Sequence, residues 1–346
     1  MNLVFSFVTI LLSISLTTAV NFTRVTEWPD KLASRPHTLQ DGISKTDNLV
    51  LVHMAVFEEK MIFSVEKLKG TSVTLVSLLM NDASAKFIPF PSSDMHEYGN
   101  CDKFEVAAGI RVESFGRLLM LDEGSFHCNA KIWAIDMKNK NQIKLIHRFS
   151  FHGPMHDLVI QETPNGKYFA YISRVNKQHI VVYSSERNES WIAYTPGTEV
   201  FSIALSSEGQ EPVRQLYFSK YDSTELYSIS VAALRNGTRT ANPKLIGKWS
   251  AIPNKMEMDN HDTLHASFLW KNYTSSWNTS EPFKEQRFHE VAGLNSFVWP
   301  ITFAWNERGT LYMTVFHEKR VPKFELFRVE DSATSINASS GKFNFE

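Results

Sequence analysis

Short apolar or alternating runs rich in Val, Ile, Phe and Tyr recur along the chain, separated by Asn, Gly, Asp, Ser or Pro. Helical periodicity is scarce, so the pattern predicts many short strands joined by tight turns. The predicted strands cover residues 49–57, 61–68, 73–79, 106–112, 117–122, 131–137, 144–151, 157–162, 168–175, 179–185, 190–195, 201–206, 215–221, 226–231, 244–249, 264–270, 288–293, 301–305, 310–316 and 324–330.

The predicted strands form groups that start near residues 50, 107, 157, 201, 264 and 301. Groups of four strands repeating every 40 to 60 residues or so, roughly one blade per group, are typical of a β-propeller. We therefore predict an all-β fold, a six-bladed β-propeller with about four strands per blade, in one domain over residues 20–330. A pair of β-sandwiches is the alternative, which the lack of a Pro- or Ser-rich linker disfavours.

The first residues, MNLVFSFVTILLSISLTTAV, are apolar and end in small side chains. Their apolar core is shorter than a membrane span of roughly 20 residues, so residues 1–19 are predicted to be a signal peptide. A signal anchor is the alternative. No later stretch has 18 uninterrupted apolar residues, and residues 331–346 are expected to form a polar C-terminal tail. We expect a secreted, extracellular protein.

Composition and charge narrow the range of partners. Hydrophobic residues make up 43% of the chain and charged residues 21%, and the net charge is -1. Since no basic stripe is present, we expect neither nucleic acid nor membrane as a partner. The chain lacks a nucleophile elbow, a zinc helix, a P-loop and a dinucleotide fingerprint, so no cofactor is expected. The oligomeric state is not indicated.

Two further features agree with export. The only cysteines, Cys101 and Cys128, are expected to pair in an oxidising compartment, with two buried free thiols as the alternative. Their number and spacing exclude a CxxC redox motif and a cysteine zinc site. Six sequons predict N-glycosylation at Asn21, Asn188, Asn236, Asn272, Asn278 and Asn337.

The fragment LLMLDEGSFHCNAKIWAID, residues 118–136, places Asp122, Glu123 and Gly124 between two apolar runs. The acidic pair is either an acid/base site or part of a turn. We expect a turn, because Asp122 supplies a short acceptor side chain and Gly124 tolerates a positive φ.

A denser polar cluster follows later in the chain, where Asp259, Asn260, His261 and Asp262 are consecutive and His265 is near. Oxygen-bearing side chains in a row can bind a hard cation such as Ca²⁺, which makes Asp259 and Asp262 the metal candidates. A solvated loop between blades is the alternative.

Residues 99–137 resemble a signature of the major royal jelly protein and yellow family, in which a Cys precedes a strand, an Arg-Leu…Leu-Asp-x-Gly run and a second Cys. Arg117-Leu118, Leu121-Asp122 and Gly124 stand at the matching places. The resemblance extends over about residues 22–330 and implies a six-bladed β-propeller. Further segments that resemble the family's signatures, in the family's order, are residues 169–192, 201–236, 275–283 and 299–315.

The resemblance also implies where a site lies. The segment SFHGPMHDLV, with His152, His156 and Asp157, resembles the family's loop that enters a strand at the central channel. Two histidines and an aspartate there are candidates for proton transfer or for contact with a ligand. A loop that merely caps the sheet is the alternative.

A second implied site comes from the blood-feeding insect branch of the family, whose propeller binds biogenic amines such as serotonin and histamine in the central channel. The matching positions here are Trp299, Ile301, Phe316 and Glu318. Trp299 and Phe316 would give an aromatic wall and Glu318 would pair with an ammonium group. Core packing is the alternative for these positions.

Three functions stay open at this point. The first is a secreted glycoprotein that holds a small aromatic or amine ligand in its channel without turning it over. The second follows from the resemblance, since some yellow proteins are linked to melanin formation through a dopachrome-converting activity. That activity would use His152, His156 or Asp157. The third is a structural or nutritive secreted protein.

Overall fold

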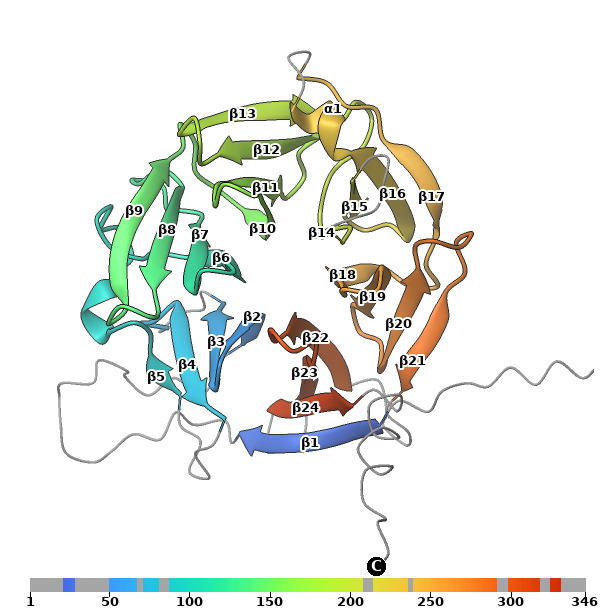
Figure 1. The fold of residues 1–346 in the computed structure, drawn as a ribbon, viewed down its shortest axis with the longest axis horizontal. Helices are drawn as coiled ribbons and strands as arrows, with labels where there is room; N and C mark the ends of the chain where they lie inside the picture. Colours follow the sequence, from blue (N-terminus) through green and yellow to red (C-terminus); the bar gives the residue numbers. More distant parts are fainter. Residues whose placement is uncertain are drawn as a thin grey trace, which may run out of the picture.

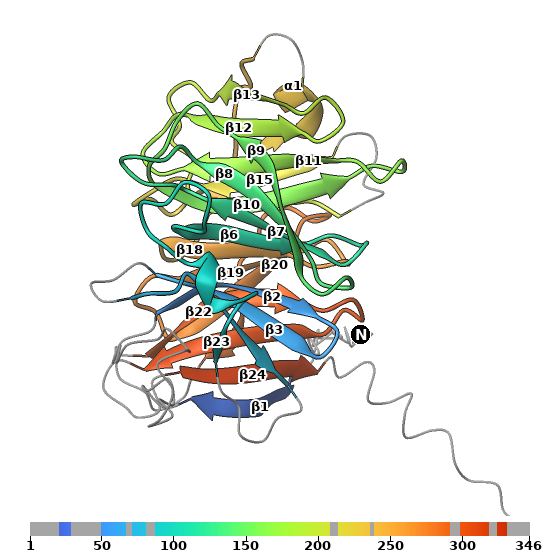
Figure 2. The same ribbon diagram turned by 90° about the vertical axis from the view of Figure 1, so that its left-hand side faces the viewer.

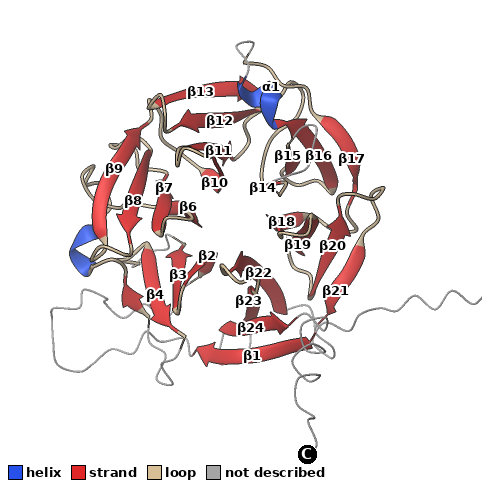
Figure 3. Ribbon diagram, in the orientation of Figure 1, coloured by secondary structure: helices blue, strands red, loops and turns tan. Residues whose placement is uncertain are grey.

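A computed structural model describes residues 21–28, 50–66, 71–80, 87–207, 214–235, 239–290, 298–317 and 324–330. Within these ranges the strands form six four-stranded antiparallel sheets arranged around one axis (Figures 1 and 3). The predicted six-bladed β-propeller is therefore confirmed. The predicted signal peptide and C-terminal tail lie outside the described residues and stay predictions.

The blades follow one another along the chain, each running from the axis outward. The first blade holds β2 (Leu51–Phe57), β3 (Lys60–Val65), β4 (Leu75–Leu79) and β5 (Ile88–Pro89). The second holds β6 (Ala107–Val112), β7 (Arg117–Asp122), β8 (Lys131–Asp136) and β9 (Gln142–Arg148), and the third holds β10 (Met155–Glu162), β11 (Tyr168–Arg174), β12 (His179–Ser184) and β13 (Glu189–Tyr194). The fourth holds β14 (Ile203–Leu205), β15 (Gln215–Ser219), β16 (Glu225–Ser230) and β17 (Lys244–Lys248), and the fifth holds β18 (Pro253–Met258), β19 (Thr263–Phe268), β20 (Tyr273–Asn278) and β21 (Gln286–Glu290).

The sixth blade joins the two ends of the described chain. It holds β22 (Val298–Trp305), β23 (Leu311–His317), β24 (Phe324–Glu330) and, as its outermost strand, β1 (Asn21–Trp28). β1 pairs antiparallel with β24, and the pair is also visible from the side in Figure 2. This pairing closes the ring, because a strand from the N-terminal part completes the sheet that the C-terminal part begins. The sequence pattern did not predict β1.

One predicted blade boundary is wrong. The fifth blade starts with β18 and not near residue 264, which lies in β19, the second strand of that blade. The sequence of β18, PNKMEM, begins with Pro and alternates Met with charged residues, so it lacks the apolar run by which strands are predicted.

Helices are few and short in the described ranges. α1 (Val231–Arg235) follows β16 directly, and a 3₁₀ turn covers Ser93–Met95. No helix in this part of the chain has the length and apolar character needed to cross a membrane.

The core lies mainly in layers between neighbouring blades. Apolar residues from the first and second blades form one buried cluster, and similar clusters join the second to the third, the third to the fourth and the fourth to the fifth. Gly109 in β6 shows how closely the inner strands approach, because a Cβ at Gly109 would lie 2.8 Å from the Cβ of Leu158 in β10. Packing of this kind fixes the innermost strands side by side around the axis.

Candidate functional site

The innermost strands β2, β6, β10, β14, β18 and β22 surround the propeller axis (Figure 1). We call the end at which these strands begin the near end of the axis, and the end at which they finish the far end. Three of these strands carry a buried polar side chain at their third residue, namely His53 in β2, Asp157 in β10 and Lys255 in β18. These three side chains belong to one buried cluster at the near end of the axis.

Asp157 lies at the centre of this cluster and contacts several of its members. Its Oδ1 lies 2.6 Å from the Lys255 ammonium and accepts the backbone N–H of Leu158 at 3.0 Å. Its Oδ2 accepts the Ser202 hydroxyl and the Ile203 N–H, each at 3.3 Å. The Asp157 side chain is 1% exposed, so these donors replace the water that a buried carboxylate would otherwise require.

A second ion pair completes the cluster. Nη2 of Arg111 lies 2.9 Å from Oε2 of Glu257 and 3.8 Å from Oδ1 of Asp157, and the Lys255 ammonium lies 4.0 Å from Glu257. Two cations therefore face two carboxylates. We refer to these four residues, Arg111, Asp157, Lys255 and Glu257, as the axial charge cluster.

The electrostatics keep Asp157 ionised. Burial alone would raise the pKa of the Asp157 carboxyl, but the charges of Lys255 and Arg111 outweigh burial and hold that pKa below its ordinary value. Burial lowers the pKa of Lys255, and Asp157 opposes that shift. A carboxylate held by several donors is a poor proton acceptor, so Asp157 acts as an anchor for the inner strands.

Two neutral imidazoles lie beside the cluster. The rings of His53 and His156 are 6.2 Å apart, and Nε2 of His156 lies 2.8 Å from the carbonyl oxygen of Asn254. Because a carbonyl only accepts, Nε2 of His156 carries the proton and Nδ1 is its basic nitrogen. Burial lowers the pKa of His156, and burial together with Lys255 lowers the pKa of His53 well below its ordinary value.

A chain of aromatic rings leads from His156 to the surface. The His156 ring stacks on Phe201 with centroids 3.7 Å apart, and Phe201 meets Tyr221 edge to face at 5.2 Å. Phe201 is buried, whereas Tyr221 is 44% exposed. This aromatic series, His156–Phe201–Tyr221, provides ring surfaces next to a charge-balanced polar cluster, a combination suited to holding a flat aromatic molecule.

The structure brings together two of the three residues predicted for proton transfer. Asp157 belongs to the axial charge cluster, and His156 lies beside it as the preceding residue of β10. His152 is exposed, where its ring approaches Phe126 at 6.2 Å and its carbonyl accepts a hydrogen bond from Arg174. His152 therefore makes contacts different from those of the cluster.

Three of the four positions predicted for amine binding, Trp299, Ile301 and Phe316, lie in the sixth blade. Ile301 is 7% exposed and belongs to the apolar cluster between the first and sixth blades, and Phe316 packs against the same cluster. Trp299 is the register partner of Phe316 across β22 and β23, and Glu318 lies outside the described residues. A ligand role for these four positions stays a prediction.

Of the two proposed cation ligands, Asp259 is occupied by protein donors, whereas Oδ1 of Asp262 is buried without a hydrogen-bond partner among the described residues. Asp259 accepts the backbone N–H groups of His261 and Thr263 and lies 3.0 Å from Nε2 of His265. Asp262 adopts a positive φ in the turn that follows β18. Across the described ranges, no group of three or more His, Cys, Asp or Glu side chains is placed to hold a metal ion. The Ca²⁺ role of Asp259 and Asp262 stays a prediction.

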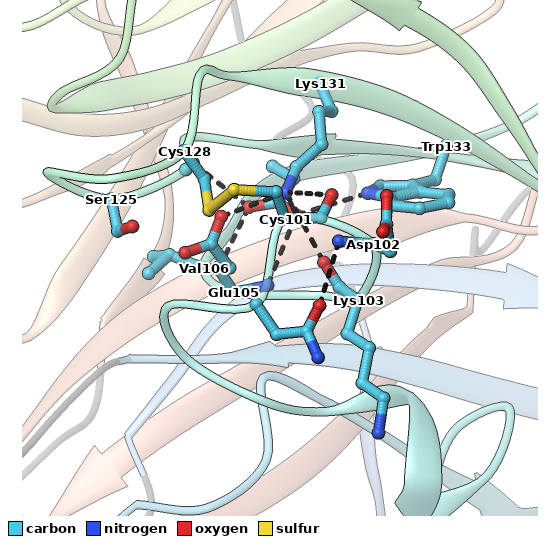
Figure 4. A network of polar contacts seen from close by, with 12 residues as sticks. Cys101, Asp102, Lys103, Glu105, Val106, Ser125, Cys128, Lys131 and Trp133 are labelled. Carbon is cyan, nitrogen blue, oxygen red and sulfur yellow. Dashed lines mark hydrogen bonds and ion pairs between the residues drawn. A yellow bond between two sulfur atoms is a disulfide. The ribbon is translucent and has the colours of Figure 1, made fainter.

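The predicted disulfide between Cys101 and Cys128 is confirmed. It closes over a buried ion cluster in which the Lys131 ammonium lies 2.9 Å from Glu105 and 3.5 Å from Asp122 (Figure 4). The ammonium also donates to the carbonyls of Cys101 and Lys103. The disulfide and the ion cluster together hold the segment before β6 against the second blade.

The Asp-Glu-Gly fragment is part of this structural unit. Asp122 ends β7 and accepts hydrogen bonds from the backbone of Val106 and Gly124 and from the indole of Trp133. Gly124 has a φ of 74°, as the turn interpretation expects. Glu123 accepts the backbone N–H of Met155 and so links this turn to β10. The fragment thus serves the fold, as its resemblance to a fold signature implied.

The sequons differ in exposure. Asn188 and Asn278 are exposed and Asn272 is half-buried. The side chain of Asn21 is not among those described, and Asn236 and Asn337 lie outside the described residues. Glycosylation at the six positions stays a prediction.

Sequence reasoning missed four members of the site, His53, Arg111, Lys255 and Glu257. A usable signal was present for His53 and Arg111, which interrupt apolar, strand-like stretches, whereas Lys255 and Glu257 lie in the charged sequence of β18. A charged residue inside a buried strand needs a partner, so such positions point to a polar cluster in the core.

The comparisons with known proteins agree with the fold. The family model for the major royal jelly protein matches residues 106–198 and 192–326. Protein yellow of Drosophila melanogaster is 22% identical over 357 residues, which cover 87% of this chain and 64% of that protein. Protein yellow of Drosophila guanche is also 22% identical, over 87% of this chain and 61% of that protein. The chain therefore spans less than two thirds of the length of these relatives.

Solved structures share the propeller architecture. Regucalcin of Agrobacterium tumefaciens, a calcium-binding protein, superimposes with a TM-score of 0.55 at 11% identity, covering 81% of this chain and 91% of that one. A gluconolactonase of Xanthomonas campestris gives 0.54 at 12% identity, covering 90% of each chain. At these identities the likeness concerns the fold alone.

Proposed function

Because the chain belongs to the major royal jelly protein family, we propose that it is a secreted yellow-type propeller that binds a small aromatic ligand at the near end of its axis. The observation that carries the proposal is the aromatic series His156–Phe201–Tyr221, which runs from the axial charge cluster to an exposed ring. Sites of this kind combine aromatic walls with a few oriented polar groups.

The charges favour a ligand with little net charge or with both signs. The carboxylates of Asp157 and Glu257 are already paired with Lys255 and Arg111, so they leave no uncompensated charge in the axial charge cluster. A biogenic amine would then need a further carboxylate, the role that the family resemblance predicts for Glu318. Aromatic amines remain the first ligands to test.

Secretion is supported by two independent features. The apolar N-terminal segment has the pattern of a signal peptide, and Cys101 and Cys128 form a disulfide, a bond that persists in oxidising compartments. Mass spectrometry of protein from the medium of expressing cells would test both export and cleavage after residue 19.

A second candidate function is proton transfer on the bound ligand, as in a dopachrome-converting enzyme. The observation that favours it is the pair of neutral imidazoles, since the lowered pKa values leave His53 and His156 unprotonated at neutral pH. Nδ1 of His53 is buried without a hydrogen-bond partner in the described part of the chain. An unprotonated imidazole nitrogen can accept a proton from a ligand, although the lowered pKa makes it a weaker base.

Calorimetric titration of the secreted protein with serotonin, dopamine, histamine and octopamine tests the binding proposal. We expect one-to-one binding that Phe201→Leu weakens at least about tenfold, roughly 1.4 kcal/mol. His147→Gln is the matched control, because His147 lies in the outer strand β9 and should leave binding unchanged. A Glu318→Gln variant tests the predicted carboxylate separately. Absence of heat with every amine would contradict amine binding.

Dopachrome turnover separates the two functions. If proton transfer operates, His156→Gln should lower the rate by about 10²- to 10⁴-fold while His147→Gln leaves it unchanged. Binding without any turnover by the unmodified protein would leave a binding propeller as the function.

A further inference from the structure

A cavity of about 460 Å³ lies at the far end of the axis, where β14, β18 and β22 finish. Its lining residues differ from those of the near-end site, although Met258 directly follows Glu257 of the axial charge cluster in β18. Ligand pockets commonly have volumes of about 300 to 1,000 Å³. The lining residues that matter here are Ser207, Arg214, Asn260, Trp305, Asn306 and Glu307.

Trp305 gives this cavity an aromatic wall. Its indole Nε1–H is buried and has no hydrogen-bond partner among the described residues. The Trp305 ring packs against His265 at a centroid distance of 5.2 Å, which holds the indole in place. Since this N–H is closed off from solvent, the ring of Trp305 is the part that a ligand in the cavity can contact.

The polar groups around the cavity are held in position by the backbone. The side-chain carbonyl of Asn306 accepts the N–H groups of Arg308 and Thr310, and Nε of Arg214 donates to the carbonyl of Ser206. The Ser207 hydroxyl donates to the carbonyl of Asp259, which leaves its oxygen able to accept. The site thus presents oriented polar groups before any ligand binds.

The mixture of donors and acceptors favours hydroxyl groups as partners. Arginine and asparagine amides donate, whereas carboxylate, amide and hydroxyl oxygens accept, and each ligand hydroxyl can do both. The lining holds charges of both signs, one cation on Arg214 and two carboxylates on Asp259 and Glu307, and so is not a cluster of a single sign. The flat indole of Trp305 adds an apolar surface suited to the C–H face of a sugar ring.

We propose that this far-end cavity is a saccharide-binding site, with Trp305 supplying the ring surface and the polar side chains of the lining supplying hydrogen bonds to sugar hydroxyls. The site is independent of the aromatic ligand proposed for the near end. Its binding step involves no bond making or breaking.

The test uses the complete protein labelled with ¹⁵N-tryptophan, whose eight tryptophans give separate indole N–H signals by NMR. Titration with maltose and with N-acetylglucosamine should shift the Trp305 signal, which is assigned by its loss in Trp305→Phe. We expect saturation with a dissociation constant of about 1 mM or tighter. Trp270→Phe is the matched control, because Trp270 lies in the loop after β19 and is 65% exposed. That variant should retain saccharide binding.

Asn260→Ala is a second variant for the case in which Trp305→Phe fails to fold. Asn260 is exposed and lines the cavity, so its substitution should alter the site without disturbing the core. It should weaken saccharide binding at least about fivefold, a change that titration resolves easily. No shift of the Trp305 signal with either saccharide would overturn the proposal. Equal shifts with phosphate or with serotonin, which lack a sugar ring, would overturn it as well.

Discussion

The Asp157 carboxylate lies 2.6 Å from the Lys255 ammonium, although 98 residues separate the two along the chain. Asp157 belongs to the third blade and Lys255 to the fifth, and both side chains are almost fully buried. The pair also touches the fourth blade, because Ser202 donates to Asp157 and accepts the N–H of Met256. Three blades therefore share one polar anchor at the axis.

This relationship predicts a large loss of stability in Asp157→Asn. The substitution leaves the Lys255 ammonium buried without its nearest counter-ion, and breaking a buried pair costs about 3 to 5 kcal/mol. Urea denaturation of both proteins would measure the difference in unfolding free energy. Asp102→Asn is the control, because the Asp102–Arg148 pair is exposed and should contribute no more than about 1 kcal/mol. A loss below about 1 kcal/mol in Asp157→Asn would refute the anchor role.

The ion cluster beneath the disulfide predicts a similar effect at Lys131. Lys131→Met leaves Glu105 and Asp122, both fully buried, without the ammonium that neutralises them. We expect a loss of about 3 to 5 kcal/mol in unfolding free energy by the same denaturation measurement. Lys103→Met removes a partly exposed pair with Glu97 nearby and should change stability by about 1 kcal/mol at most. Equal effects of the two substitutions would contradict this interpretation.

Two glycines with the same backbone conformation allow a matched test of the Asp-Glu-Gly turn. Gly124 and Gly197 both have a φ of 74°. A Cβ at Gly124 would lie 2.2 Å from the carbonyl oxygen of Cys128, whereas a Cβ at Gly197 meets nothing within 4 Å. Gly197→Ala should therefore lower the unfolding free energy only by the cost of placing an alanine in the left-handed conformation, about 1 to 2 kcal/mol. Gly124→Ala should destabilise by about 1 to 3 kcal/mol more, because the clash forces the backbone to move. Thermal unfolding would rank the two, and a smaller effect at Gly124 would be inconsistent with the tight turn.

Buried histidines predict acid sensitivity. Burial lowers the pKa of His96 to about 4, and Nδ1 of His96 accepts the backbone N–H of Thr74, which requires the neutral ring. The unfolded chain has a His pKa of about 6.5. Below that pH the unfolded state takes up a proton that the folded state does not. Stability is therefore fully present above about pH 6.5 and falls as the pH drops toward 4, by at most about 1.4 kcal/mol per pH unit.

Denaturation of the protein and of His96→Gln at pH 7, 6 and 5 would check this expectation. The variant should lose less stability on acidification than the unmodified protein, because it lacks one titrating group. His127→Gln serves as the control, since His127 is exposed in the loop after β7. Parallel pH profiles for the unmodified protein and His96→Gln would contradict the assignment.

The sequence by itself determined the class of fold and part of the near-end site. Short apolar runs in repeated groups indicate blades, because alternation along a strand records which face is buried. The presence of only two cysteines in a chain predicted to be exported indicates that they form a disulfide with each other. His156 and Asp157 were also identified, through a local segment that resembles a family signature.

The tertiary structure decided which segments become strands and which charges pair, where these depend on closure of the ring of blades. β1 becomes a blade strand only because β24 lies beside it, and β18 is a strand although its charged residues break the apolar pattern. Lys255 and Glu257 lie in a charged sequence typical of a surface, yet closure of the ring brings them, together with Arg111, into the cluster around Asp157. Local patterns record the burial of neighbouring residues, whereas the pairing of distant charges at the axis exists only once all six blades have met.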